Sequence, residues 1–246
     1  MKDMPPILMA LVDGSAYSES VCRHAAWIAT RTGAQVKLYH VLDPHRARDK
    51  RDLSGAIKLG ARSDLLEKLS ALDEQHAKLS QAQGRALLDD ARALIEGEGV
   101  TDVVTRLRNG DIVETVVAKE GAADMILIGK RGEEAGLDSP HLGSNIERIV
   151  RASHKPVFVA NRAFRPIRRV LIAYDGGVSA MKAVNSVAND PLFAGLEVVV
   201  ATVGAEDEDT RRMLEDARAT IAAGAHAVET RVLRGQPGKT LHEVVE

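Results

Sequence analysis

The stretch ILMALVDGSAYSES, residues Ile7–Ser20, joins an apolar run to Asp-Gly, a polar turn and the start of a helical pattern. Residues Arg169–Lys182, RVLIAYDGGVSAMK, repeat the same order. The apolar runs are continuous and do not alternate with polar residues, as expected for parallel strands that are covered by helices on both faces. These stretches therefore predict two copies of a unit that begins with a strand, a turn and a helix.

Later landmarks keep the same order after the two aspartates, Asp13 and Asp175, and the first two also keep the same distances from them. A glycine follows each aspartate by 20 positions and a valine by 28: Gly33 and Val41 in the first copy, Gly195 and Val203 in the second. VTRLRNGD (104–111) then resembles ETRVLRGQ (229–236). We predict a first domain at residues 1–162 and a partial second domain at residues 163–246.

An insertion at about residues 44–100 makes the first copy longer than the second. Its first part, DPHRARDKRDLSGAIKLGARSD, is polar and basic, which is typical of a surface loop but also suits contact with a partner. In the second part, apolar residues and one histidine recur near helical spacing: Leu65, Leu69, Leu72, His76, Leu79, Leu87, Ala91 and Leu94. We predict one long amphipathic helix, or two shorter helices broken at Gly84.

The rest of the first copy alternates strand and helix patterns. Strands are expected at 7–12, 35–41, 103–108, 125–128 and 157–159, and helices at 18–32, 111–120 and 144–153. This order predicts an α/β fold with a doubly wound parallel sheet, repeated in tandem. Ligands bind such sheets at the carboxyl ends of the strands, where strand order reverses. Asp13, Val41 and the loop after Ile128 are therefore expected to share one crevice.

The composition limits the classes of function. Of the 246 residues, 45% are hydrophobic and 28% charged, and the formal net charge of −2 gives no indication of nucleic-acid or membrane binding. The single cysteine, Cys22, excludes an internal disulfide and fits a cytoplasmic protein; we expect it to be buried. No signal peptide is expected, and no stretch approaches the roughly 18 apolar residues of a membrane span.

The loop ILIGKRGEEAGLDSPHLGSN, residues Ile126–Asn145, allows two interpretations. Glycines, free backbone N–H groups, a helix N-terminus and the cations Lys130 and Arg131 would suit a phosphate group. Glycines also simply end strands, and Gly-Ser begins helices. The spacing matches neither a Walker A loop nor the dinucleotide fingerprint. Asp13 likewise is either a turn and capping residue or an acceptor for a ribose or a base.

Together these motifs resemble the universal stress protein family. The resemblance is carried by the strand that ends in Asp-Gly-Ser, by VKLYHVLD, by RNGDIVETVVAKEGAADMILIGKRG and by LGSNIERIVRASHKPVFVANR. It covers residues 5–162 well and residues 168–246 in part. It implies a Rossmann-like, adenine nucleotide alpha-hydrolase-like fold. ATP-binding members carry Gly-x-x-Gly, nine residues, then Gly-Ser/Thr; here the spacer, 133–142, has ten residues, with three acids and a proline.

The resemblance implies an ATP site in the first domain, with Mg²⁺ or Mn²⁺ arriving with the phosphates. Asp13 and Val41 would line the adenosine, and the glycines with Ser144 and Asn145 would hold the phosphates. The full set of implied binding residues is Asp13, Gly14, Ser15, Val41, Gly129, Arg131, Gly132, Gly143, Ser144 and Asn145. The second copy keeps Asp175 and Val203 without a phosphate loop, so no second nucleotide site is expected there.

The sequence alone is compatible with three functions. The first is an ATP-binding stress-response or signalling module that acts through partner binding or dimerisation, as a homodimer or an internal pseudo-dimer. The second is a nucleotide-independent, stress-related interaction protein whose glycine loop is only structural. The third is an enzyme that hydrolyses ATP or transfers a nucleotidyl group. No nucleophile–base pair stands out, so at most slow hydrolysis is expected, and His141 is the histidine to test.

Overall fold

The computed structural model describes residues 5–43, 62–131 and 144–245, with the backbone course alone for residues 62–67 and 144. Within the chain two compact units are distinguished, Met1–Phe164 and Arg165–Glu246. Each unit has its own parallel sheet and its own apolar core, and each is described by itself below.

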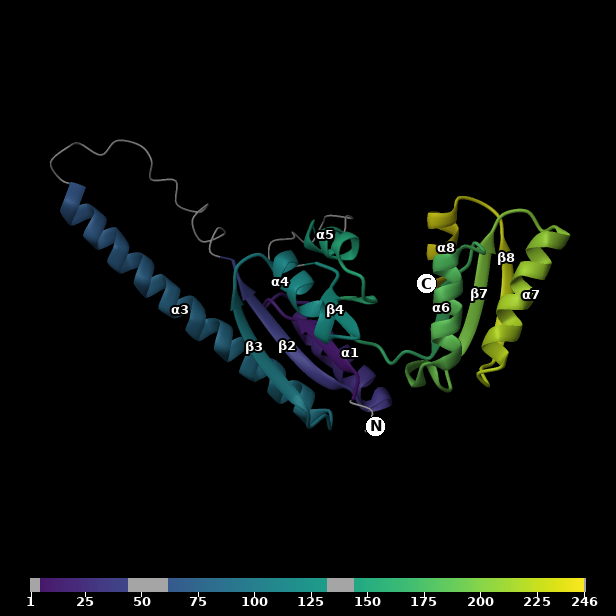
Figure 1. Cartoon of the computed structure of the whole chain (residues 1–246), viewed down its shortest axis with the longest axis horizontal. Coiled ribbons are helices and arrows are strands. Elements are labelled where there is room, and N and C mark those ends of the chain that lie inside the picture. Colours follow the sequence, from purple (N-terminus) through teal and green to yellow (C-terminus); the bar gives the residue numbers. More distant parts are fainter. Residues whose placement is uncertain (1–4, 44–61, 132–143, 246) are drawn as a thin grey trace. The chain divides into compact units, whose positions relative to one another are not determined.

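The first unit alternates strands and helices around one parallel sheet (Figure 1). Its strands are β1 (Ile7–Leu11), β2 (Gln35–Leu42), β3 (Val103–Asn109), β4 (Met125–Gly129) and β5 (Val157–Ala160). Its helices are α1 (Ser18–Thr32), α3 (Arg62–Gly97), α4 (Ile112–Lys119), the 3-10 turn η1 (Glu120–Ala122) and α5 (Ser144–Ala152). The strand order is β3-β2-β1-β4-β5, with every neighbouring pair parallel. This is the predicted doubly wound α/β sheet, and its strand order reverses at β1.

Helices cover both faces of this sheet, which explains why the central strands β1 and β4 are apolar and almost fully buried, whereas the edge strand β3 carries exposed arginines. On one face α1 and α3 pack against each other, with α1 on β1 and α3 on β2 and β3. On the other face α4 and α5 close a core of buried residues from both strands and helices: Met9, Leu11, Tyr39, Val116, Ala123, Ile126, Ile128, Ile146 and Ile149. The sheet therefore forms the central layer of three.

Two helix ends follow directly from the local sequence. Asp111 caps α4, since its side chain accepts hydrogen bonds from the N–H groups of Val113 and Glu114 at 2.7 and 3.0 Å. The helix therefore begins one residue later than predicted. Gly33 ends α1 in the left-handed conformation, with φ +69°, and donates its N–H to Ala29.

Helix α3 is continuous over 36 residues, which confirms the first alternative, one long helix, and rules out the break at Gly84 that the second alternative required. Gly84 is instead the point where α3 lies closest to the sheet. An added Cβ would lie 2.8 Å from Cδ1 of Leu107 on β3 and 2.9 Å from Cδ2 of His40 on β2. Because glycine has no side chain, it leaves room for this close contact between helix and sheet. The helical backbone accommodates a glycine at this position.

The second unit contains strands β6 (Arg169–Ala173), β7 (Glu197–Val203) and β8 (Val228–Leu233), paired in parallel in that order. Its helical segments are α6 (Val178–Asn189), the 3-10 turn η2 (Pro191–Phe193), α7 (Glu208–Ala222) and α8 (Pro237–Val245). Matched glycines of the two copies adopt nearly equal φ angles: +79° and +75° at Gly14 and Gly176, +69° and +72° at Gly33 and Gly195, +128° and +133° at Gly110 and Gly235. The two copies thus make the same turns at the same places.

Candidate functional site

The carboxyl ends of β1, β2 and β4 meet at one edge of the first sheet. Leu11 pairs with Tyr39, and Ala10 pairs with Leu127. Asp13 follows β1 by two residues, Val41 is the second-last residue of β2, and Lys130 directly follows β4. The predicted adenosine residues and the start of the glycine loop therefore lie at the edge where the strand order reverses.

Asp13 organises the turn between β1 and α1. Its Oδ1 accepts hydrogen bonds from the N–H of Ser15 at 3.0 Å and from the hydroxyl of Ser18 at 3.2 Å. The Ser18 hydroxyl oxygen in turn accepts from the N–H groups of Asp13 and Gly14. Gly14 has φ +79°, which favours glycine. The turn interpretation of Asp13 is thus confirmed, and Asp175 repeats it by accepting from the N–H of Gly177 at 2.8 Å.

Gly129, the last residue of β4, lies directly against this turn. An added Cβ would be 2.6 Å from the Cβ of Tyr17. The close approach brings the turn after β1 and the loop after β4 together across the point where strand order reverses. Sequence reasoning missed Tyr17 and Ser18, although their place at the start of the helix predicted from residue 18 marked them as part of the turn.

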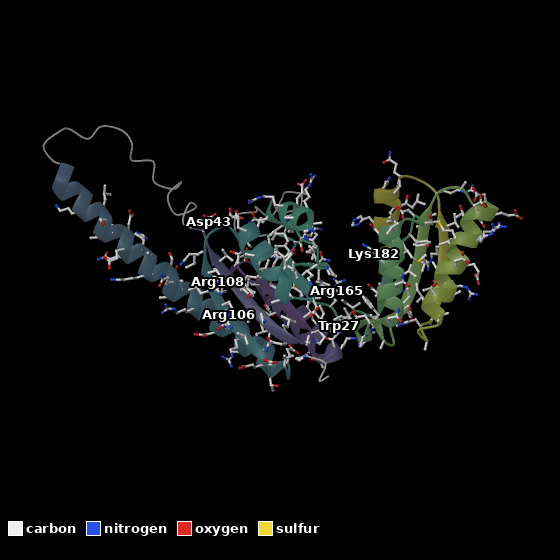
Figure 2. All side chains as sticks on the ribbon, in the orientation of Figure 1. Trp27, Asp43, Arg106, Arg108, Arg165 and Lys182 are labelled. Carbon is white, nitrogen blue, oxygen red and sulfur yellow. The ribbon has the colours of Figure 1, made fainter. Side chains whose placement is uncertain are left out.

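Two further residues of β2 and β3 bear on the site. Nδ1 of His40 lies 2.8 Å from the carbonyl oxygen of Val12 and so fixes the strand end that precedes Asp13. Val41 pairs with Arg108, and alternation along strands places both side chains on the same face of the sheet. Arg106 and Arg108 extend from β3 as exposed side chains (Figure 2). Arg108 therefore brings a cation next to Val41 that the motif analysis did not single out.

The remaining predicted residues are only partly within the described chain. Arg131 follows β4 and is half-buried, while Ser144 and Asn145 are the first two residues of α5. Gly132, Gly143 and His141 lie outside the described residues. The structure thus brings together Asp13, Gly14, Ser15, Val41, Gly129 and Arg131 through adjoining strand ends.

Other sequence expectations concern groups away from this edge. Cys22 is buried, and burial together with the nearby Glu19 raises its pKa to about 12. The thiol therefore stays protonated, as expected of a core residue. Over the described ranges, no group of three or more His, Cys, Asp or Glu side chains is arranged to hold a metal ion. The helices in that part of the chain also lack an apolar run of membrane-spanning length.

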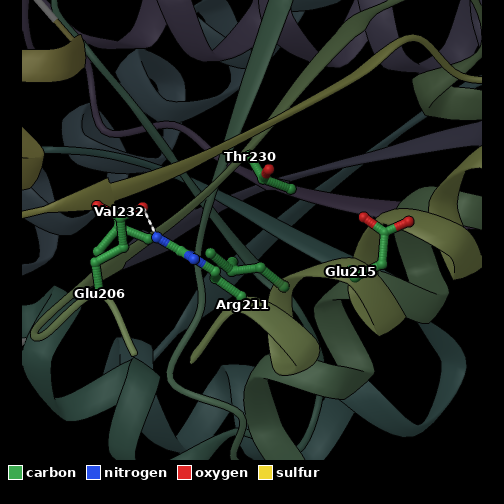
Figure 3. Close-up of a pocket in the computed structure, with 6 residues that line it drawn as sticks. Glu206, Arg211, Glu215, Thr230 and Val232 are labelled. Carbon is green, nitrogen blue, oxygen red and sulfur yellow. Dashed lines mark hydrogen bonds and ion pairs between the residues drawn. The ribbon is translucent and has the colours of Figure 1, made fainter. Parts of the chain in front are cut away.

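A polar depression of about 420 Å³ lies in the second unit, between α7 and β8 (Figure 3). Glu206, Arg211, Leu214, Glu215, Thr230 and Val232 line it. Its charges are already paired, because Arg211 contacts Glu206 at 3.0 Å and Glu215 contacts Arg218 at 2.7 Å. None of the predicted nucleotide residues lines this depression.

Comparison with known proteins gives consistent results for the family. Residues 4–161 match the family described as "Universal stress protein family". The chain is 32% identical over 232 residues to universal stress protein Slr1230 of Synechocystis, covering 93% of this chain and 81% of that protein. It is 28% identical over 153 residues to universal stress protein MJ0531 of Methanocaldococcus jannaschii, covering 61% and 78%. A solved universal stress protein from Archaeoglobus fulgidus shares the fold, with a TM-score of 0.64, 18% identity and coverage of 95% of this chain and 80% of that one.

Proposed function

The chain belongs to the universal stress protein family, and from this premise we propose that its first unit binds ATP in a stress-response or signalling role. Nucleotide occupancy would alter binding to a partner protein or dimerisation. The observation that carries the proposal is the convergence of Asp13, Val41 and Gly129 at the edge where strand order reverses. This is the place where doubly wound sheets accept ligands.

Each part of the edge suits a different part of a nucleotide. The Asp13 carboxylate can accept hydrogen bonds from ribose hydroxyls, and the half-buried Val41 offers apolar contact to a base. Arg108 beside Val41 adds a guanidinium that can stack on an aromatic ring. The N-terminus of α5, with Ser144 and Asn145, provides the partial positive charge that favours phosphate. Gly132 and Gly143 would complete the phosphate loop, and Arg131 would add charge.

A divalent cation would enter this site with the phosphates. Mg²⁺ is usually held by phosphate oxygens together with one or two carboxylates and waters. In the described part of the chain Asp13 follows β1 and Asp43 follows β2 at this edge, and no group of three or more His, Cys, Asp or Glu side chains is arranged to hold a metal ion. This agrees with a cation carried mainly by the nucleotide. When bound, Mg²⁺ or Mn²⁺ would neutralise phosphate charge. The ion would not need a complete set of protein ligands for this.

We also propose that residues 1–162 form the nucleotide domain and residues 163–246 a partial second domain. The matched φ angles at three pairs of glycines support a common origin of the two. The second domain repeats the aspartate turn at Asp175. In this proposal it acts as a pseudo-symmetric partner of the first domain and binds no nucleotide of its own.

Matched substitutions in the two copies test ATP binding by titration calorimetry with ATP and Mg²⁺. Val41→Trp is expected to weaken binding at least tenfold by filling the base position, while Val203→Trp, its counterpart in the second copy, leaves binding unchanged. Asp13→Ala should likewise weaken binding and Asp175→Ala should not. Thermal unfolding of each variant separates lost binding from lost folding. Absence of ATP binding by the folded wild type would overturn the proposal.

The alternative is a nucleotide-independent interaction protein, and one observation favours it. Leu72 and Leu79, two turns apart on α3, are 47% and 55% exposed and so offer apolar contact to a partner. Mass spectrometry of small molecules released from the purified protein distinguishes the two functions. Released adenine nucleotide supports the first, and an empty protein that also fails the titration supports the second.

A further inference from the structure

The N-terminal half of α3 extends beyond the part of the helix that belongs to the repeated α/β unit. Counted from the matched glycines Gly110 and Gly235, α7 corresponds to residues 83–97 of α3, so residues 62–82 have no counterpart in the second unit. Where side chains are described, those from Lys68 to Leu79 are exposed except the half-buried Leu69. In Figure 1 this half of the helix extends away from the sheet of its own unit.

The exposed leucines lie on a different side of the helix from the residues that face the sheet. The sheet-facing side contains Gly84, Leu88, Ala91 and Ile95, all buried. At 3.6 residues per turn, the line through Leu69, Leu72, His76 and Leu79 lies roughly 100° around the axis from it. Continued toward the N-terminus, the sheet-facing side meets Ser80, Ala77 and Asp73, none of which is buried. The leucines therefore belong to a second contact surface.

This surface has the spacing of a coiled coil. Leu69, Leu72, His76 and Leu79 follow one another at intervals of three, four and three residues, a repeat of 3.5. Leu72 and Leu79 then occupy d positions, and Leu69, His76 and Gln83 occupy a positions. Leucine is the usual d residue of parallel dimers, and a polar residue at a restricts register and oligomeric state at a cost in stability.

We propose that residues 68–83 of α3 form a parallel two-stranded coiled coil with the same segment of a second copy of the chain. The flanking charges favour a second copy of the chain as the partner and a parallel orientation of the two helices. Lys68 falls at g and Asp73 at the following e position, so in a parallel pair each lysine meets the aspartate of the other chain, twice by symmetry. An antiparallel pair that packs Leu72 against His76 of the other chain would instead bring the two Asp73 carboxylates near each other.

The proposed coiled coil is short, so the dimer is expected to be weak and concentration-dependent. Its core has two leucine layers at d, and the a positions include His76 and Gln83, which pack less well than aliphatic residues. Replacing His76 by leucine should therefore strengthen association. Stronger association of His76→Leu would identify a coiled-coil interface. On a helix face that only contacts solvent, an added leucine would not produce a dimer of defined size.

Sedimentation of the full chain over a concentration series tests the proposal with neighbouring substitutions. Leu72→Lys is expected to raise the dimer dissociation constant at least tenfold. Ala71→Lys, one residue away at the exposed c position, is expected to leave it unchanged. His76→Leu should lower it at least tenfold. A wild type that stays monomeric at every concentration, or equal effects of Leu72→Lys and Ala71→Lys, would overturn the proposal.

The direction of the helices has its own test. The native Cys22 is buried, so a single introduced cysteine on α3 reports on contact between two copies. Gln83→Cys at an a position should form a disulfide-linked dimer on mild oxidation, because a positions face each other in a parallel pair. Ala71→Cys should not. A dimer that persists while Gln83→Cys fails to cross-link would rule out the parallel arrangement and place the interface elsewhere.

Discussion

Tyr17 and Gly129 lie so close that a methyl group on the glycine would stand 2.6 Å from the Cβ of the tyrosine. The contact joins the turn after β1 to the end of β4, and so determines how closely the two sides of the proposed nucleotide site approach. No other residue type fits at 129 unless the turn moves.

Gly129→Ala is therefore expected to lower the free energy of unfolding by about 1–3 kcal/mol, the usual cost of overpacking a close contact. Denaturant unfolding measures this loss. Gly121→Ala is the matched control, because an added Cβ there has nothing within 4 Å and the residue is exposed. Equal stability of both variants would show that the turn adapts freely.

Gly84→Ala should destabilise the first unit even though alanine is the better helix former. The change gains about 1 kcal/mol in helix propensity, but the new Cβ would meet His40 and Leu107 below 3 Å. We expect a net loss of about 1–2 kcal/mol from this overlap. Gly97→Ala, in the last position of the same helix with open space around it, should be neutral or slightly stabilising. A stabilised Gly84→Ala would mean that α3 can move away from the sheet at little cost.

A buried carboxylate near the end of α5 should make stability depend on acid pH. Glu120 is 8% exposed and accepts hydrogen bonds from the Ser153 hydroxyl and from the N–H and ring of His154. The Ser153 hydrogen bond, assisted by those from His154, lowers the pKa of Glu120 against the opposing effect of burial. A carboxyl with a lowered folded-state pKa stabilises the fold above its unfolded pKa, and this contribution disappears as pH falls through the folded pKa.

Unfolding measured against pH should therefore show stability falling below about pH 4.5, near the ordinary glutamate value. Glu120→Gln should flatten that part of the profile and cost about 1–2 kcal/mol at neutral pH. Asp90→Asn, on the exposed side of α3, should leave the profile unchanged. A profile that keeps its acid slope in Glu120→Gln would assign the slope to other carboxylates.

Cys22 should resist alkylation in the folded protein. The thiol is 1% exposed and its pKa is raised to about 12, so at pH 8 almost none of it is the reactive thiolate. Mass spectrometry after iodoacetamide treatment should find the native chain unmodified and the denatured chain modified once. Rapid modification under native conditions would indicate that α1 opens locally.

The sequence by itself determined the order of strands and helices and the presence of two copies. Continuous apolar runs such as Ile7–Leu11 and left-handed glycines such as Gly33 are local signals, so helix α1 was predicted at its observed bounds, Ser18–Thr32. The same signals located Asp13, Val41 and Gly129 at strand ends. Gly132 and Gly143 lie outside the described residues, so their place in the site is still a prediction.

Only the tertiary structure decided what each glycine and each apolar face contacts. Gly84 has the pattern of a helix break, yet it marks the close approach of α3 to His40 and Leu107. The helical spacing of Leu72, Leu79, Leu87 and Ala91 looks like one stripe along the chain. The structure divides that stripe, because Ala91 faces the sheet while Leu72 and Leu79 do not. The physical reason is that burial depends on which elements meet in space, and a one-dimensional pattern does not contain that information.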